Sequence, residues 1–446
     1  MPLFIALPLA AGFLIPLAGF VSERLVRAMA VLTTALLVAL ALGRIGAGVA
    51  IYAVGGWRPP FGINLVGDAL SGFFLLIIAV VGFLVTVYST AYMKRYTAEA
   101  KYYCLLMLMI AGMNGVVATG DLFNMYVFLE IAAISSYALV AFGIGHEELE
   151  ASLKYLVLGS IGSSFILVGI AFLYSITGTL NLAHLGRILE GNGNQGMVHF
   201  IAALFFAGFG IKAAMIPFHA WLPDAHPSAP APVSAMLSGL LIKALGLYCI
   251  LRLFYSVFGL DQTYGSILMF LGLLSMVVGV LLAVGQFDFK RLLAYHSISQ
   301  MGYILFAFGL GTPLAIIGGL LHTLNHTFFK SLLFLCSGAV EYATGTRDLK
   351  QLGGLWKKMP VTSAACSIAS LSISAVPPLG GFFSKLIIVI AAVQAYDSLG
   401  PVAYVCAALT VFVSFVTLVS FVKVQKMVMF GPLPDRLAGV REVPAP

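Results

Sequence analysis

Apolar windows, each long enough to cross a bilayer, follow one another through almost the whole chain. A helix needs roughly 20 apolar residues to span the hydrocarbon core. The windows lie at 2–21, 28–50, 69–92, 102–120, 122–143, 154–177, 197–217, 232–256, 265–286, 292–310, 313–342, 361–393 and 400–429. Short polar turns separate them. The pattern predicts an all-α polytopic membrane protein with about 13 transmembrane helices.

The composition excludes several other classes of protein. Of the 446 residues, 61% are hydrophobic and only 9% are charged, whereas about one quarter of a soluble domain is charged. Such a chain cannot cover a water-facing surface, so it is neither a soluble enzyme nor a disordered protein. Its formal net charge is +7, and positive residues this few cannot form a surface that binds the phosphates of a nucleic acid. The lipid bilayer is therefore an expected partner, and nucleic acid is not.

The positive charges are distributed unevenly over the turns. Sixteen lysines and arginines lie in turns that follow odd-numbered windows, and four follow even-numbered windows, which are Arg44, Arg58, Arg187 and Arg252. Cytoplasmic loops carry the excess of Lys and Arg. We therefore expect a multi-pass protein of the cell (inner) membrane, with its N-terminus outside and its C-terminus in the cytoplasm.

The sequence also resembles itself at an offset of 166 or 167 positions. The segment 141–145 (AFGIG) matches 307–311 (AFGLG), and 178–182 (GTLNL) matches 345–349 (GTRDL). A repeat unit of five windows crosses the membrane an odd number of times, so the second copy begins on the opposite side and must be inverted. Inverted repeats of this kind are a transporter architecture. The expected organisation is a three-helix segment (1–100), two inverted five-helix repeats (101–256 and 257–430) and a cytoplasmic tail (431–446).

Prolines interrupt the seventh and the twelfth window. Pro217 follows Lys212 in the seventh, and Pro377 and Pro378 precede Lys385 in the twelfth. Proline removes a backbone donor and clashes with the preceding turn, so both helices are predicted to be broken. Backbone groups freed at that depth need protein or water around them.

Four lysines lie inside predicted spans: Lys212, Lys243, Lys330 and Lys385. A lysine at the centre of a membrane helix costs about 2.5–3.5 kcal/mol on insertion scales, so it needs polar surroundings. Glu130 is the only carboxylate well inside a predicted span, and Lys212 is its expected partner. A buried Glu–Lys pair can act as a proton switch, because the loss of one charge changes the proton affinity of the other. The alternative is a static pair that fixes helix packing.

Histidines extend this set of titratable groups. His322, His326 and Lys330 are spaced four residues apart and share one face of a helix. A histidine pair could bind zinc or haem, but zinc needs three or four ligands. A proton-transfer relay, with His296 as a further member, is preferred. No cofactor and no metal is expected, and the five cysteines form no cluster motif.

The segment 210–234, GIKAAMIPFHAWLPDAHPSAPAPVS, resembles the proton-conducting, antiporter-like subunits of respiratory complex I, Mrp-type sodium/proton antiporters and membrane-bound hydrogenases. The resemblance covers roughly residues 65–430. Lys243, Gly246 and Tyr248 are most similar to the pattern of the D-type subunits of Mrp antiporters and of their counterpart in membrane-bound hydrogenase-type complexes. One branch of complex I subunits has a glutamate at the position of Lys385 and fits less well.

The resemblance implies roles for these residues and a setting for the chain. Glu130 would pair with Lys212, while Lys243, His322, His326, Lys330 and Lys385 would continue a proton-transfer line through two inverted repeats. The implied function is proton translocation, with exchange for sodium left open, alongside other membrane subunits and, in redox-driven complexes, a cytoplasmic redox module. Two alternatives remain: a redox subunit that binds quinone or haem, and a scaffold without transport.

Overall fold

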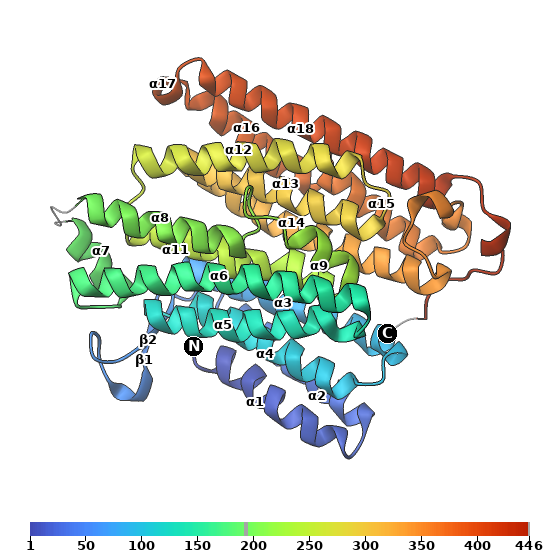
Figure 1. The fold of residues 1–446 in the computed structure, drawn as a ribbon, viewed down its shortest axis with the longest axis horizontal. Helices are drawn as coiled ribbons and strands as arrows, with labels where there is room; N and C mark the ends of the chain where they lie inside the picture. The colour runs from blue at the N-terminus through green and yellow to red at the C-terminus, as the bar shows by residue number, and fades with distance from the viewer. Residues whose placement is uncertain (191–194, 445–446) are drawn as a thin grey trace. The chain divides into compact units, whose positions relative to one another are not determined.

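The computed structural model describes residues 1–190 and 195–444, and most of them are helical (Figure 1). The elements up to residue 212 are α1 (Leu3–Gly19), α2 (Glu23–Leu42), β1 (Ala50–Ala53), η1 (Val54–Gly56), β2 (Asn64–Gly67), α3 (Ala69–Tyr92), η2 (Met93–Arg95), α4 (Glu99–Ala118), α5 (Leu122–Val140), η3 (Ala141–Gly143), α6 (His146–Thr177), α7 (Leu182–Glu190) and α8 (Gln195–Lys212). The later elements are α9 (Leu222–Ser228), α10 (Ala231–Met236), η4 (Leu237–Leu247), α11 (Tyr248–Ser256), α12 (Gln262–Val284), α13 (Phe289–Leu310), α14 (Pro313–Thr344), η5 (Leu349–Gln351), η6 (Leu355–Lys357), α15 (Pro360–Ile373), α16 (Gly380–Gln394), α17 (Tyr396–Leu399), α18 (Val402–Val424), η7 (Gln425–Phe430) and η8 (Asp435–Leu437).

The helices have the length and composition of a multi-pass membrane protein. Among the described residues, nine helical segments qualify as membrane spans: Glu23–Leu42, Ala69–Arg95, Glu99–Ala118, Leu122–Gly143, His146–Thr177, Gln195–Lys212, Ala231–Ser256, Gln262–Val284 and Val402–Phe430. Three shorter apolar helices, α1, α15 and α16, accompany them. α13 and α14 are also long, but they bury many polar side chains.

The chain forms two compact units. Unit 1 comprises Met1–Ala213 and Leu240–Leu260, and unit 2 comprises Ala214–Gly239 together with residues 261–444. Within unit 1, α1 packs on α4, α4 on α5, and α6 on α8. Within unit 2, α12 packs on α13, α13 on α14, and α14 on α16. Each unit therefore has its own helical core. The last two residues of the predicted tail lie outside the described residues.

Local signals in the sequence set many helix ends. Aspartate caps the N-termini of α5 and α13, where Asp121 and Asp288 accept hydrogen bonds from backbone N–H groups in the first turn. Gly178 and Gly345 end α6 and α14 with φ angles of 66° and 72°. Glycine adopts this left-handed conformation without a steric cost, so it allows the chain to turn away from the helix axis at both places.

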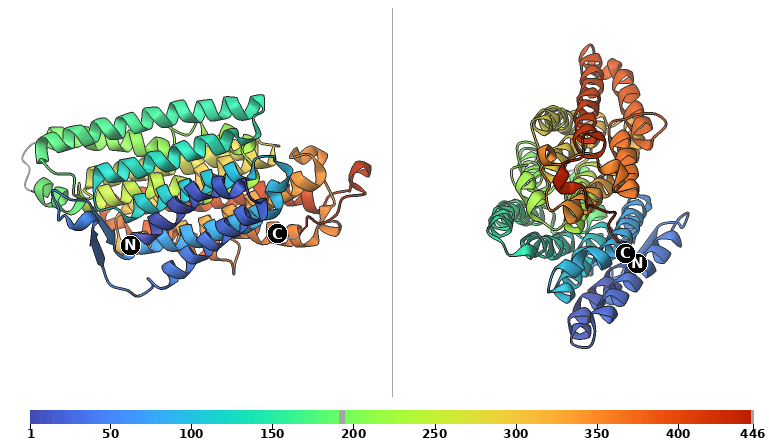
Figure 2. Two further views of the ribbon diagram at one scale, coloured as in Figure 1. Left: turned by 90° about the horizontal axis from the view of Figure 1, so that it is seen from below. Right: turned by 90° about the vertical axis from the view of Figure 1, so that its right-hand side faces the viewer.

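The region between α2 and α3 corrects the sequence prediction. The window predicted at 28–50 ends as a helix at Leu42, where glycines follow at 43, 46 and 48. Residue Ala50 already begins strand β1, which pairs with β2 in antiparallel register from Ala50↔Gly67 to Ala53↔Asn64. This hairpin stands out from the helices of unit 1 (Figure 2). The protein is thus mostly, but not entirely, α-helical.

Candidate functional site

Glu130 and Lys212 meet inside unit 1. Glu130 lies on α5, and Lys212 is the last residue of α8. The ammonium Nζ is 3.8 Å from Glu130 Oε1, and the exposed fractions of the two side chains are 3% for Lys212 and 26% for Glu130. Ser163 of α6 donates its hydroxyl hydrogen bond to the same carboxylate oxygen. The lysine is therefore buried, while the glutamate keeps one side open.

Two further acceptors surround the Lys212 ammonium. Nζ donates to the hydroxyl oxygen of Tyr137 at 3.2 Å and to the carbonyl oxygen of Gly159 at 3.0 Å. An ammonium group has three N–H donors. These two oxygens accept two of them, and the Glu130 carboxylate contributes a charge at ion-pair distance. A Cβ at position 159 would lie 2.0 Å from the Tyr137 hydroxyl oxygen. Only glycine leaves room there for both the tyrosine and the lysine.

Lys243 lies near the same end of α8. It is fully buried in the π-helical segment η4. Gly246 of that segment lies so close to Ala213 that a Cβ on Gly246 would be 2.5 Å from the Ala213 backbone nitrogen. The glycine thus brings the segment that carries Lys243 against the residue that follows Lys212. π-helical segments of this kind occur frequently at functional sites.

Lys385 is the buried lysine of α16 in unit 2. Its Nζ donates to the carbonyl oxygen of Ile373 at 2.9 Å, and Ile373 is the last residue of α15. The ammonium also lies 4.4 Å from the ring centroid of Tyr303, a distance at which the ring face attracts a cation. In the described part of the chain, no carboxylate forms an ion pair with it. Lys385 thus has a carbonyl oxygen and an aromatic ring as partners, whereas Lys212 has the carboxylate of Glu130.

His322 of α14 adjoins this lysine. Its Nδ1 lies 3.0 Å from the hydroxyl oxygen of Ser384, the residue before Lys385, and its Nε2 lies 3.2 Å from Gln300 Oε1. The rings of Tyr303 and His322 are 5.5 Å apart between centroids. Lys385, Tyr303 and His322 therefore form one polar group, and Gln300 is a member that the sequence does not single out.

The remaining predicted residues of unit 2 continue along α14 and onto α13. The His326 ring stacks with that of His322 at 6.2 Å, and Lys330 Nζ lies 5.8 Å from the ring centroid of Phe334. His296 of α13 contacts another helix: its Nε2 is 2.9 Å from the Ser420 hydroxyl of α18. All three predicted residues are fully buried.

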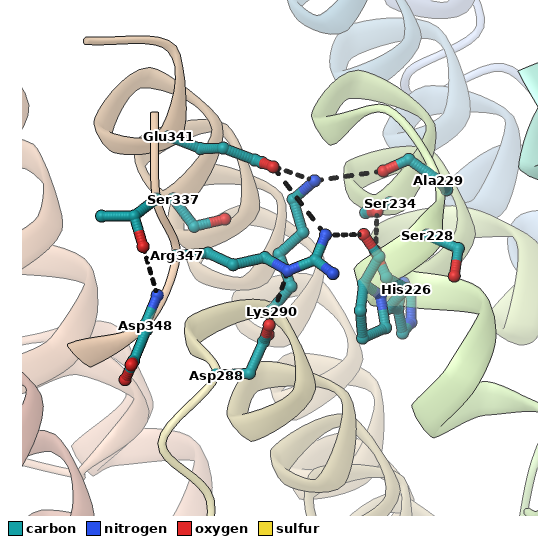
Figure 3. Close-up of polar contacts among 12 residues, drawn as sticks. His226, Ser228, Ala229, Ser234, Asp288, Lys290, Ser337, Glu341, Arg347 and Asp348 are labelled. Atoms are coloured by element: carbon teal, nitrogen blue, oxygen red, sulfur yellow. Dashed lines mark hydrogen bonds and ion pairs between the residues drawn. The ribbon is translucent and has the colours of Figure 1, made fainter. Parts of the chain in front are cut away.

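A second charged cluster in unit 2 is not predicted by the sequence. The window pattern places Lys290 in a turn, but it is in the first turn of α13, is 2% exposed, and lies 2.8 Å from a carboxylate oxygen of Glu341 in α14. Arg347 bonds to Asp288 beside them (Figure 3). Glu341 lies near the end of α14 and at the edge of the window 313–342, so the hydropathy pattern does not single it out. Arg252, also expected in a turn, lies in α11 and binds Asp68.

Comparison with known proteins identifies the family. The family model described as "NADH:quinone oxidoreductase/Mrp antiporter, TM" matches residues 119–410, and that of "NADH-Ubiquinone oxidoreductase (complex I), chain 5 N-terminus" matches residues 51–103. The N-type subunit of NADH-quinone oxidoreductase from Desulforudis audaxviator is 38% identical over 445 residues, which cover 98% of this chain and 86% of that protein.

An antiporter protein and a solved complex give the same assignment. The D-type subunit of the Na+/H+ antiporter from Alkalihalophilus pseudofirmus is 37% identical over 385 residues, or 86% of this chain and 77% of that protein. A chain of the Mrp complex from Dietzia sp. DQ12-45-1b superposes with a TM-score of 0.90 at 31% identity, covering 99% of this chain and 84% of that one. The protein is thus a multi-pass membrane protein and belongs to the NADH:quinone oxidoreductase/Mrp antiporter family.

Proposed function

We propose that this chain is a proton-translocating subunit of a multi-subunit membrane complex, either an Mrp-type antiporter or a related redox-driven complex. One of its relatives is named as part of a Na+/H+ antiporter, and another as part of an NADH-quinone oxidoreductase. Both names describe one subunit of a larger assembly, so other membrane subunits are the expected partners. A cytoplasmic redox module is the additional partner in the second case.

The Glu130–Lys212 pair carries this proposal. A buried ammonium is costly unless it is paired and hydrogen-bonded, and Lys212 has a carboxylate, a hydroxyl and a carbonyl around it. Protonation or movement of Glu130 would withdraw the charge that holds the ammonium. Lys212 could then release its proton, because desolvation favours the neutral amine. The pair can therefore hold and release one proton in turn.

Lys385 is proposed to do the same in unit 2. Its ammonium has a carbonyl and a ring face as partners, and His322 with Ser384 stands next to it. Imidazole changes its charge near neutral pH, so it can accept or supply the proton that the lysine exchanges. Lys243, His326, Lys330 and His296 are proposed as the remaining members of the proton-transfer line.

We also propose that the membrane region has about thirteen spans built from two inverted five-helix repeats at 101–256 and 257–430. Matching helix interruptions support this. α8 ends at Lys212 and α15 ends at Ile373, and in each case the alanine two residues later has a positive φ, 52° at Ala214 and 60° at Ala375. The charge bias of the turns supports a cytoplasmic C-terminus and an N-terminus outside.

Two substitutions test the proposed function in the assembled complex. Lys212→Met and Glu130→Gln should each reduce proton movement, measured as ΔpH formation in sealed vesicles, because the first removes the proton carrier and the second removes the charge beside it. We expect complete loss for Lys212→Met and about a tenfold loss for Glu130→Gln, since about 1.4 kcal/mol of lost pairing changes protonation tenfold. Assays with and without Na+ decide whether sodium is the exchanged ion.

The control is the exposed pair Glu150–Lys154, which lies on α6 of the same unit with an Oε1–Nζ distance of 2.8 Å. Glu150→Gln should leave transport unchanged. Normal transport in both Lys212→Met and Glu130→Gln, with assembly of the complex intact, would show that the buried pair only fixes helix packing, and the proposal would then fail.

A further inference from the structure

The buried ammonium of Lys290 marks a second place in unit 2 where a proton can be held. Its Nζ lies 2.8 Å from Glu341 Oε2 and donates to the carbonyl oxygen of Ala229 at 3.1 Å. Ala229 lies between α9 and α10, so Lys290 of α13 contacts both this connection and Glu341 of α14 (Figure 3). An ammonium taken out of water needs such partners to remain charged.

Arg347 is the second cation of the cluster. It binds Asp288 through Nε at 2.6 Å and the carbonyl oxygen of Pro227 through Nη1 at 2.6 Å. The same Nη1 lies 3.8 Å from Glu341 Oε1. Glu341 therefore lies between two cations. Both cations also donate hydrogen bonds to backbone carbonyl oxygens just after His226, at Pro227 and Ala229. The charges alternate in the order Asp288, Arg347, Glu341 and Lys290.

The two members of the Lys290–Glu341 pair differ in their access to water. The Lys290 side chain is 3% exposed and that of Glu341 is 19% exposed. Asp288 is also partly exposed, but it caps α13 through the Arg291 N–H and receives the Arg347 hydrogen bond, so its charge is committed to those donors. Glu341 is the carboxylate of this cluster that both contacts the buried lysine and reaches the surface.

We propose that Glu341 and Lys290 form a further proton-exchange pair, in which Glu341 receives protons from water and passes them to Lys290. When a proton binds Glu341, the attraction on Lys290 is lost while Arg347 remains. The N–H bond of the ammonium then breaks, and its proton passes to the proton-transfer line of the proposed function. The O–H bond of Glu341 then breaks as an N–H bond forms on the neutral Lys290 amine, 2.8 Å away, and the ion pair returns. This inference rests on the proposed function, for which it supplies an entry or exit point.

The groups that face Glu341 set its response to pH. They are Lys290 from α13 and Arg347 from the turn after α14, with Asp288 behind Arg347. His226 of α9 is the titratable side chain on the far side of the two cations (Figure 3). Two cations favour the ionised carboxylate, so the protonated form is a transient state that should appear as the pH falls.

Glu341→Gln in the full complex tests the pair. This variant keeps the size of the side chain and one acceptor oxygen, but its NH2 group cannot accept and carry a proton as a carboxylate does. We expect ΔpH formation to fall about tenfold or more, because loss of a proton-transferring group is costly, and its pH dependence to flatten. The infrared difference spectrum between neutral and acidic pH should lose one protonated-carboxyl band. Glu150→Gln, at an equally short but exposed ion pair, is the matched control.

Lys290→Arg serves as a second variant in case Glu341→Gln fails to assemble. It keeps a cation beside Glu341, but arginine does not release a proton in proteins, so transport should stop in an assembled complex. Wild-type transport with an unchanged pH profile in Glu341→Gln, while Lys212→Met is inactive, would overturn the pair without touching the proposed function. If Lys212→Met and Glu130→Gln both transport normally, the proposed function fails instead. An unaltered infrared spectrum in Glu341→Gln overturns the Lys290–Glu341 pair independently.

Discussion

In unit 1 a backbone bridge joins Asp121 to Asn181, and in unit 2 the residues 167 positions later, Asp288 and Asp348, form the same kind of bridge. The hydrogen bonds beside the bridges also correspond. The N–H of Leu122 donates to the Leu180 carbonyl at 2.8 Å, and in unit 2 the N–H of Phe289 donates to the carbonyl of the equivalent residue, Arg347, at 3.0 Å. The main chain thus makes the same connection twice.

The side chains on this common frame are different. Leu180 of unit 1 is replaced at the matching position by Arg347, and Asn181 by Asp348. The buried lysines differ as well, because Lys212 has Glu130 beside it and Lys385 has a carbonyl and an aromatic ring. In unit 2 the partly buried glutamate is Glu341, and it forms an ion pair with a different lysine, Lys290. Backbone hydrogen bonds hold the frame, so the positions of the charges can vary without loss of the fold.

The largest expected effect comes from replacing the lysine that has no carboxylate partner in the described structure. Lys385→Met should abolish ΔpH formation, and Lys385→Arg should do so too, because a guanidinium keeps the charge but does not give up its proton. The test is ΔpH formation in vesicles that hold equal amounts of the complex. Lys357→Met, at an exposed position outside the cluster, should behave like the wild type.

The Arg variant separates two views of unit 2. If Lys385→Arg transports protons normally, only the positive charge is required, and unit 2 differs from unit 1 by not exchanging a proton at this site. If both Lys385 variants are inactive while the Lys357 variant is active, the two buried lysines share one role in spite of their different partners.

The sequence is most informative where a charge is costly. It predicts the pairing of Lys212 with Glu130 because each would be expensive alone in an apolar window, and the structure places them 3.8 Å apart. The Lys290–Glu341 pair escapes prediction because Lys290 is in a predicted turn and Glu341 is at a window edge, where water usually solvates a charge. Gln300 is not predicted for another reason. A neutral amide has no charge to bury, so its role is recognised only from its contact with His322 in the structure.

Helix ends and short elements are harder to predict for a related reason. The window 28–50 hides the start of the β hairpin, since strand β1 is as apolar as the end of a helix. The short helix α7 and the π-helical form of η4 also give no distinct hydropathy signal. Hydropathy reports burial in an apolar medium, whereas these features depend on local backbone geometry.

A smaller effect is expected from a change that moves no charge. In Gly159→Ala the new Cβ would lie 2.0 Å from the Tyr137 hydroxyl oxygen, so the tyrosine must move and the Lys212 ammonium loses one acceptor. A hydrogen bond to a charged group contributes about 1.5–3 kcal/mol, and we expect transport to fall roughly tenfold with Lys212 and Glu130 still present. ΔpH formation measures this.

Gly72→Ala is the control, because a Cβ at that helical position meets nothing within 4 Å. It should leave transport unchanged. Equal transport in the Gly159 and Gly72 variants would show that Tyr137 is not needed beside Lys212, and it would make unit 1 less dependent on precise packing than unit 2, where Tyr303 lies directly against Lys385.

The smallest expected effect concerns stability and compares two capping aspartates that each hold an arginine. Asp68 caps α3 and binds Arg252 at 2.6 Å in unit 1, as Asp288 caps α13 and binds Arg347 at 2.6 Å in unit 2. Burial alone would raise the pKa of Asp68. The hydrogen bonds from Arg252 and Ser71, together with the positive charge of Arg252, outweigh burial and lower the pKa from 3.8 to about 2. The ion pair therefore stabilises unit 1 wherever the carboxyl is ionised.

Asp68→Asn should reduce the free energy of unfolding by about 1–2 kcal/mol near neutral pH, since asparagine still caps the helix but loses the charge. Because the folded-state pKa is depressed, the stabilisation is complete above the ordinary value of 3.8 and disappears as the pH falls toward 2. The difference between variant and wild type in thermal unfolding in detergent should shrink over that interval. Asp261→Asn, where the aspartate caps α12 through the Tyr264 N–H, should change stability much less. A difference for Asp68→Asn that persists unchanged at about pH 2 would mean that shape, and not charge, makes this cap important.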